Sequence, residues 1–235
     1  MARVKPQVRL KQLIDAATTV FIAKGYRRTS VEEIARTMGV TPAATYLYVA
    51  SKEALFDLVI QYHFFRLDLE SLDQIPFPNP PQGQTLDRLR RRLNPVRDLS
   101  RLLEAVKTKR VSDPWQEFRE ILTQMFNGLV DYRYGVRMIE TSALDWPELA
   151  DFFIRGFRKK ALGHLRDYIG QRIDMGLFRE QPDVSAAARL MLSTVYFFAV
   201  NRHFDLIASD AYDETVALEM IVINLGRAFI KIEQP

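Results

Sequence analysis

Apolar residues recur every three or four positions over the first part of the chain, which is the spacing of one face of an α-helix. The residues that share this spacing are Leu10, Leu13, Ile14, Ala17 and Phe21. Gly25 then follows as a helix stop signal. We therefore expect a first helix over about 8–24.

A second, shorter helix begins with a polar start signal. Ser30 and Glu33 stand at the spacing of a capping box, in which each side chain bonds the backbone amide of the other residue. Gly39 suits the left-handed conformation that commonly ends a helix. The pattern predicts a helix over about 31–38.

A third helix starts almost at once after this glycine. Thr41 is a good N-cap, and Pro42 fits the first helical position, where its missing amide costs nothing. We expect this helix over about 42–49. Two short helices joined by a tight glycine turn are typical of a helix-turn-helix.

The remaining chain keeps helical spacing and shows no useful stretch of period two. A cluster of prolines at 76, 78, 80 and 81, followed by Gly83, interrupts it. Further helices are expected over about 52–70, 85–109, 114–132, 136–144, 148–175, 183–207 and 213–232. The sequence thus predicts an all-α fold, with an N-terminal three-helix helix-turn-helix domain over 1–52 and a C-terminal helical domain over 53–235.

The positive charge is concentrated at the N-terminal end. The formal net charge is +4, but residues 1–52 contain nine Lys/Arg against three Asp/Glu, which leaves −2 for the rest. Because phosphate neutralisation supplies much of the affinity for nucleic acid, this asymmetry indicates a polyanionic partner. A merely solvated basic surface remains the alternative.

Catalytic and metal chemistry find little support in the sequence. The chain has no cysteine, and His63, His164 and His203 show no metal-ligand spacing. No Gly-rich phosphate loop or Ser/His/Asp motif is visible. The longest apolar run, 186–200, is too short to span a bilayer. We expect no cofactor, no metal and no membrane association, and a cytoplasmic protein.

Residues 13–55 carry a set of matching features in a consistent order, and with them the chain closely resembles the DNA-binding domain of the TetR (tetracycline-repressor) family. The matching residues are Ala16, Ala17, Phe21, Lys24, Gly25, Tyr26, Thr29, Ser30, Ile34, Ala35, Gly39, Val40, Tyr46 and Ser51 to Leu55. The chain departs from the usual pattern at Thr45, where the family has an apolar residue, and at Val49, where it has Phe. Its segment 71–112 is also longer than usual.

The resemblance implies a homodimeric transcription regulator, in most cases a repressor, that binds operator DNA. It implies that a small lipophilic or aromatic effector enters the C-terminal domain, which also dimerises, and releases the DNA. An activator with the same fold, a sequence-independent DNA-packaging protein and an enzyme are the alternatives. The basic stretch that includes Arg88, Arg90 and Arg91 would be a solvated helix face or a contact to DNA or an acidic partner.

The second helix of a helix-turn-helix enters the major groove of double-stranded DNA, and its first residues reach the base edges. Small residues there could touch thymine methyls, so hydrogen-bonding readout would fall on their neighbours, while hydroxyls and a lysine near helix ends would contact phosphates. For Tyr46 a place in the core, and for Lys52 an ordinary surface position, are the alternatives. The expected DNA-contacting residues are Arg28, Thr29, Ser30, Thr41, Pro42, Ala43, Ala44, Thr45, Tyr46, Leu47, Tyr48 and Lys52.

Two sets of apolar residues are candidates for the other roles that the resemblance implies. The helix over about 183–207 is apolar nearly all round, which indicates burial on both sides, and together with the last helix it could form a four-helix interface between two chains. The candidates for this interface are Leu190, Val195, Phe198, Met220, Ile221 and Leu225. The candidates for an effector pocket are Phe118, Met125, Phe126, Met138 and Phe153, for which an ordinary core is the alternative.

Overall fold

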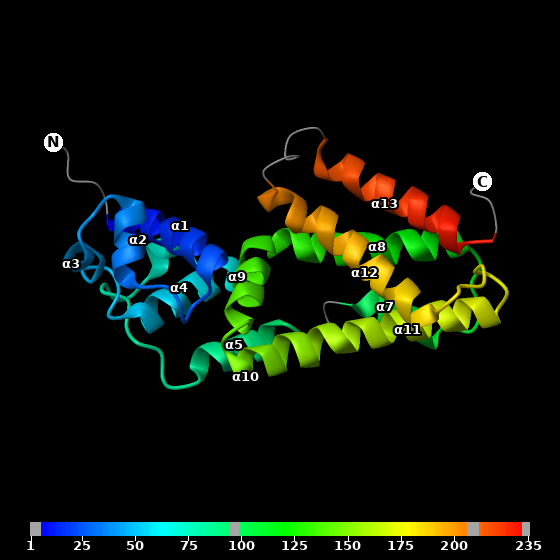
Figure 1. Ribbon diagram of the computed structural model, residues 1–235, viewed down its shortest axis with the longest axis horizontal. Coiled ribbons are helices and arrows are strands. Elements are labelled where there is room, and N and C mark those ends of the chain that lie inside the picture. The colour runs from blue at the N-terminus through cyan, green and yellow to red at the C-terminus, as the bar shows by residue number, and fades with distance from the viewer. Residues whose placement is uncertain (1–5, 95–98, 206–211, 232–235) are drawn as a thin grey trace. The chain divides into compact units, whose positions relative to one another are not determined.

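The computed structural model describes residues 6–94, 99–205 and 212–231, and this part of the chain is largely helical (Figure 1). Within these ranges no strand forms, and only two isolated bridges occur, between Val49 and Phe77 and between Phe178 and Ile230. The prediction of an all-α fold with an N-terminal helix-turn-helix is confirmed.

The helices pack into two compact units. The first consists of the residues up to Leu93 together with Tyr134–Ile154, and the second of Asn94–Arg133 together with the residues from Arg155 onward. This division groups residues by packing. The boundary after residue 52, which would separate a DNA-binding domain from a ligand-binding and dimerisation domain, stays a prediction.

The first unit is built on helices that follow the expected start signals closely. Its elements are α1 (Pro6–Lys24), α2 (Val31–Met38), α3 (Pro42–Thr45), α4 (Lys52–Phe65), a 3-10 turn η1 (Leu69–Ser71), α5 (Gln84–Arg92), α9 (Arg133–Ala143) and α10 (Pro147–Ala150). The bounds of α2 are those that the sequence predicts. The helix α4 ends at Phe65, about five residues before the predicted end, because Arg66 adopts a left-handed conformation.

The centre of the first unit is α4, in which the seven successive residues Ala54–Ile60 are all buried. α1 packs on it from one side and α5 from another, so no face of this stretch remains exposed. The buried carboxylate of Asp57 accepts hydrogen bonds from the hydroxyl of Thr85 on α5 and from the side-chain amide of Gln61, each at 2.7 Å. These bonds satisfy a charge that would otherwise be costly to bury.

The second unit is a bundle of longer helices around an aromatic core. Its elements are α7 (Ser100–Lys107), α8 (Pro114–Asp131), α11 (Lys159–Asp174), α12 (Val184–Ala199), the 3-10 turn η3 (Asn201–Phe204) and α13 (Glu214–Phe229). A π-helical segment, Asp151–Arg158, leads into α11, and only its residues from Arg155 onward belong to this unit. In the core, the ring of Phe118 meets Phe178 edge to face at 5.8 Å, and Phe229 lies beside both.

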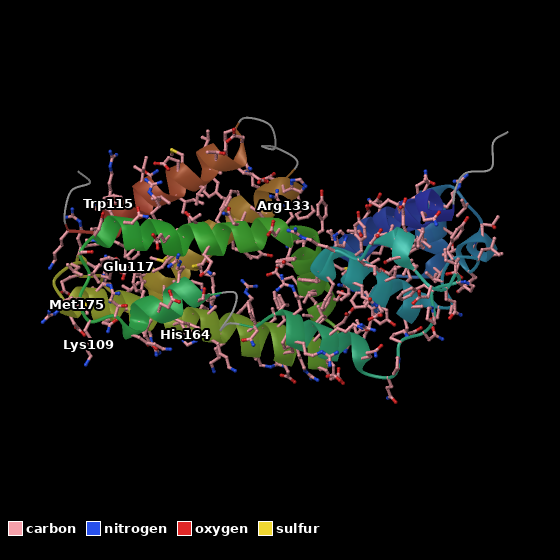
Figure 2. The ribbon with its side chains drawn as sticks, turned by 180° about the vertical axis from the view of Figure 1, so that it is seen from behind. Lys109, Trp115, Glu117, Arg133, His164 and Met175 are labelled. Carbon is pink, nitrogen blue, oxygen red and sulfur yellow. The ribbon has the colours of Figure 1, made fainter. Side chains whose placement is uncertain are left out.

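A buried ion pair joins three helices of this bundle. The guanidinium of Arg172 on α11 is fully buried and donates two hydrogen bonds, of 2.8 and 2.7 Å, to the carboxylate of Glu117 on α8, which Figure 2 labels. It also donates to the carbonyl of Ala105 on α7. Removing one member of the pair would leave a buried charge without compensation.

None of the helices in the described ranges is long and apolar enough to cross a membrane. Within the same ranges, no group of three or more His, Asp or Glu residues is placed to hold a metal ion.

Candidate nucleic-acid interface

The corner between α1 and α2 is held by a glycine that no other residue could replace without movement. Gly25 has a φ of +79°, and a Cβ built on it would lie 2.9 Å from the carbonyl oxygen of Thr141 on α9. The backbone amide of the next residue, Tyr26, donates a hydrogen bond to the hydroxyl of Ser142 on α9, at 3.0 Å. The corner is therefore fixed against α9 within the first unit.

The capping box predicted for α2 is present. The amide of Glu33 donates to the Ser30 hydroxyl at 3.3 Å, and the Ser30 amide donates to the Glu33 carboxylate at 3.2 Å. The hydrogen bond from Lys24 and, to a smaller extent, the bond from the Ser30 amide lower the pKa of Glu33. At the other end, Gly39 adopts φ +72°, and its amide and that of Val40 bond back to α2.

The third helix, α3, is the one expected to enter the major groove, and we call it the recognition helix; it is shorter than predicted. The Thr41 hydroxyl accepts from the amide of Ala44 at 3.3 Å, as expected of an N-cap, but α3 ends at Thr45 and not near Val49. The amides of Tyr48 and Val49 both donate to the carbonyl of Thr45, which converts residues 46–48 into a turn. In place of the predicted extension to 49, residues 46–48 form this turn and Val49 pairs with Phe77.

This short element presents an exposed face. Thr41, Pro42 and Ala43 are exposed at its start, and after its end the side chains of Tyr46 and Leu47 are 45% and 66% exposed. Ala44 and Tyr48 are half-buried. Tyr46 is thus not a core residue, and the small residues that begin the helix leave its backbone open to a partner.

Two of the predicted contact residues lie inside the unit. Thr29 is 3% exposed, and its hydroxyl donates to the carbonyl of Gly25 at 2.7 Å. Thr45, the last residue of α3, is 1% exposed. Both side chains support the surface from within and do not form it.

Lys52 is also engaged inside the unit. Its ammonium donates to the carbonyl oxygens of Tyr26 and Thr29, at 3.2 and 3.0 Å, and lies 4.6 Å from the centre of the Tyr26 ring. These contacts tie the start of α4 to the α1–α2 corner. An ammonium has three N–H groups, so one remains beyond these two bonds.

Two arginines of the same corner face carboxylates near α10. Nε of Arg28 lies 3.0 Å from Oδ2 of Asp145, and Arg27 lies 3.9 Å from Glu148. The Arg28 side chain is still 56% exposed. It therefore reaches solvent beside α2 while an acidic partner neutralises part of its charge.

An aromatic cluster behind the corner was not predicted from the sequence. The Tyr26 ring packs on Phe56 of α4 and on Trp146, with centroids 4.6 and 5.1 Å apart, and its hydroxyl donates to Glu53 at 2.9 Å. Burial, together with the bond to Glu53, raises the pKa of Tyr26. The only signal in the sequence is the aromatic residue before Pro147, which does not reveal its partner.

The candidates for an effector pocket are all buried, and the structure places them in both units. Phe118, Met125 and Phe126 belong to the core of the second unit, whereas Met138 and Phe153 belong to the first. A described groove of about 150 Å³ lies elsewhere, between α7 and α8. Most of the residues that line it are polar or charged, and the lining consists of Arg101, Glu104, Ala105, Thr108, Glu117, Glu120 and Ile121.

The dimer candidates divide by exposure. Val195, Ile221 and Leu225 are buried within the second unit, and Phe198 is half-buried. Leu190 on α12 and Met220 on α13 are 57% and 52% exposed. Two further exposed apolar side chains on these helices, outside this set of candidates, are Phe197 and Val216.

Comparison with known proteins gives matches for the N-terminal helices. Residues 13–59 match the family described as bacterial regulatory proteins, tetR family. The uncharacterized HTH-type transcriptional regulator YuxN of Bacillus subtilis (strain 168) is 41% identical over 54 residues, which are 23% of this chain. The match spans only about a fifth of the length of that relative, 19%.

Solved structures resemble the chain over nearly its whole length. The ketosteroid transcriptional regulator KstR2 of Mycobacterium tuberculosis aligns with a TM-score of 0.56 and 18% identity, over 95% of this chain and 96% of that one. A HlyIIR mutant protein aligns with a TM-score of 0.51 and 16% identity, over 97% of this chain and 100% of that one. At such identities the likeness concerns the fold.

Proposed function

Because the chain belongs to the tetR family of bacterial regulatory proteins through its residues 13–59, we propose that it is a transcriptional repressor. In this proposal it binds operator DNA as a homodimer, and a small lipophilic or aromatic effector releases it from the DNA. The family is one of regulators, which leaves the enzyme alternative without support. A DNA-binding regulator of this kind acts in the cytoplasm, and we include that location in the proposal.

The observation that carries the proposal is the exposed face of the recognition helix. Thr41 caps α3, and Pro42 and Ala43 are its first two residues; in a helix-turn-helix these positions reach base edges in the major groove. Tyr46 and Leu47 extend the same exposed surface. Small and apolar side chains favour contact with thymine methyls, and the Tyr46 hydroxyl suits a phosphate.

We divide the predicted contact residues into two groups by their position. Those we expect to contact DNA are Arg28, Ser30, Thr41, Pro42, Ala43, Ala44, Tyr46, Leu47 and Tyr48. Thr29, Thr45 and Lys52 are buried or bonded within the unit, so we assign them to supporting the surface, with the remaining N–H of Lys52 available to a phosphate. Sequence readout then rests on few hydrogen bonds, which favours recognition of DNA shape.

The proposed dimer would use the outer faces of α12 and α13. Leu190 and Phe197 are two turns apart on α12, and Val216 and Met220 are one turn apart on α13. All four are exposed large apolar side chains, which together favour association. A second copy with the same faces would bury them in a symmetric four-helix contact.

The proposed effector is apolar because the core that would receive it is apolar. Phe118, Met125 and Phe126 offer ring and thioether surface next to Phe178 and Phe229. The groove between α7 and α8 is small and lined by charged groups, and we do not assign it this role.

The test is selection of DNA by the full-length protein from a pool of randomised duplexes, followed by binding at several salt concentrations. We expect one sequence to be enriched, and its affinity to fall steeply with salt, because each neutralised phosphate contributes about 0.9 to the log–log slope. Adding lipophilic compounds should release the DNA. Equal binding to all duplexes would instead indicate a packaging protein, and transcription from the selected site in vitro separates a repressor from an activator.

A further inference from the structure

We propose that the long connection between α4 and α5, residues 67–83, is a strap that positions the recognition helix for sequence discrimination. Residues Phe77 and Asn79 are its positioning residues. The inference rests on the proposed DNA-binding function and adds a role for a segment that this function does not otherwise use. In Figure 1 the strap is the cyan to teal stretch that follows α4 and runs on to α5.

The first anchor of the strap is a pair of backbone hydrogen bonds to the turn after α3. The amide of Phe77 donates to the carbonyl of Tyr48 at 2.7 Å, and the amide of Ala50 donates to the carbonyl of Phe77 at 2.9 Å. Val49, between these two positions, is fully buried and forms the isolated parallel bridge with Phe77. The turn is thus held from outside the helix-turn-helix.

The second anchor joins the strap to the start of α4. The hydroxyl of Ser51 accepts from the amide of Ala54 at 3.1 Å, which is the N-cap bond of α4. The same hydroxyl donates to the side-chain oxygen of Asn79 at 2.5 Å. One hydroxyl therefore serves both the helix cap and the strap, and the four residues from Tyr48 to Ser51 are fixed at three points.

The recognition element needs such support because it is so short. A helix of four residues is far below the length at which helices hold themselves in water, so its neighbours must fix its conformation. The exposed side chains of Tyr46 and Leu47 directly precede Tyr48, the first residue that the strap holds. Fixing the carbonyl of Tyr48 consequently fixes the direction in which these two side chains leave the surface.

The part of the strap that bonds the turn suits a position beside DNA. The nine residues 74–82, which include Phe77 and Asn79, carry no charged side chain and so add no repulsion toward phosphates, whereas the acidic residues of the strap lie before them in 67–73. Four of the nine are prolines, which preset the backbone and lower the entropy lost when the strap is ordered. Both ends are tied down, since η1 packs on α1 and Thr85 of α5 bonds Asp57.

The test uses two matched pairs in the full-length protein. Phe77→Pro removes the amide that bonds Tyr48, whereas Phe77→Ala removes the same ring and keeps the amide. Asn79→Ala removes the acceptor of Ser51, whereas Gln82→Ala shortens an exposed amide of the same strap. The measured quantities are hydrogen–deuterium exchange over residues 42–51 without DNA, and the ratio of affinities for a duplex enriched by the wild type and a scrambled duplex of equal length.

We expect Phe77→Pro to exchange faster than Phe77→Ala over 42–51 and to lose about tenfold in the affinity ratio, the scale of one or two lost hydrogen bonds. Asn79→Ala should differ from Gln82→Ala in the same direction, with an unchanged salt slope in both pairs.

Equal exchange and equal ratios within each pair would overturn the proposal. So would a parallel loss of affinity for both duplexes, which a purely structural role produces. If the wild type enriched no duplex, the proposed function would fail, while the exchange data would still decide whether the strap holds the turn.

Discussion

The hydroxyl of Thr18 on α1 lies 2.9 Å from Nε2 of His63 on α4, and the imidazole stacks on the ring of Tyr134 on α9, with centroids 5.6 Å apart. One side chain thus connects three helices of the first unit. Burial lowers the pKa of His63 to about 4. The charge of Lys11 lowers it further by a smaller amount, and the charge of Asp15 partly opposes both effects. The histidine is therefore neutral in the folded protein over the physiological range.

The depressed pKa of His63 predicts a loss of stability in acid. In the unfolded chain a histidine titrates near 6.5, so between this pH and about 4 the unfolded state binds the additional proton and is favoured. The stabilisation is complete above pH 6.5 and declines as the pH falls toward 4. We expect a decrease of roughly 3 kcal/mol in the free energy of unfolding from this residue, which chemical denaturation between pH 4 and 7 measures.

A matched pair of variants isolates this contribution. His63→Gln keeps a polar partner for Thr18 but has no proton to gain, so its unfolding free energy should depend less on pH in this range. His164→Gln, on α11, leaves the contact with Thr18 intact. An equal reduction in both variants would contradict the assignment to His63.

The exposed face of the recognition helix predicts a binding defect without a folding defect. Tyr46→Ala should weaken binding to the selected duplex about tenfold, because it removes both an apolar contact and a hydroxyl, and Tyr46→Phe should show the share of the hydroxyl. Thermal unfolding should change little, since the side chain is exposed. Phe65→Ala, at another exposed aromatic residue of the first unit, is the control and should bind DNA normally.

The ion pair between Arg28 and Asp145 predicts a gain of affinity. Asp145→Asn removes the negative charge that faces Arg28, so the guanidinium becomes available to a phosphate, and binding should tighten severalfold at low salt. Arg28→Ala should weaken binding. If Asp145→Asn bound DNA no better than the wild type, Arg28 would have no phosphate within reach. Because the Arg28 side chain is 56% exposed, water screens the pair and it contributes little to stability, so the melting temperature should change little in both variants.

The outer faces of α12 and α13 predict how the dimer can be dissociated. Leu190→Glu combined with Met220→Glu places like charges on the proposed interface. Sedimentation should then give a mass near the 27.3 kDa of one chain. Leu144→Glu changes a residue that is 78% exposed in the first unit and should leave the mass unchanged. A wild type that already sediments as one chain would refute the proposed dimer.

Local signals in the sequence predicted local structure well. The capping residues Ser30 and Thr41, and the left-handed Gly39, gave the start and end of α2 and the start of α3, since these signals act over three or four residues. Residues 95–98, which lie within the predicted helix 85–109, are outside the described part of the chain.

Contacts between residues that are far apart in the sequence could not be predicted from these local signals. Nothing near Tyr48 in the sequence indicates that Phe77 will bond its carbonyl and help end α3 at Thr45. Arg28 and Asp145 are likewise separated by more than a hundred residues, so no spacing rule relates them. The two short helices and their glycine turn followed from local patterns, but the exposure of Tyr46 and the assignment of Thr29, Thr45 and Lys52 to support of this surface required the folded chain.

Gly25 and Gly39 share a left-handed backbone but differ in their surroundings, and this difference sets how the N-terminal module tolerates redesign. A side chain at Gly25 would collide with the backbone of Thr141, whereas the space around Gly39 is open for 4 Å. Asparagine, which accepts this conformation better than most residues, should therefore be tolerated at position 39 only. The turn at Gly39 therefore allows the segment that follows it to be exchanged for one that prefers another DNA sequence. Gly25, at the corner before α2, must be retained in such a design.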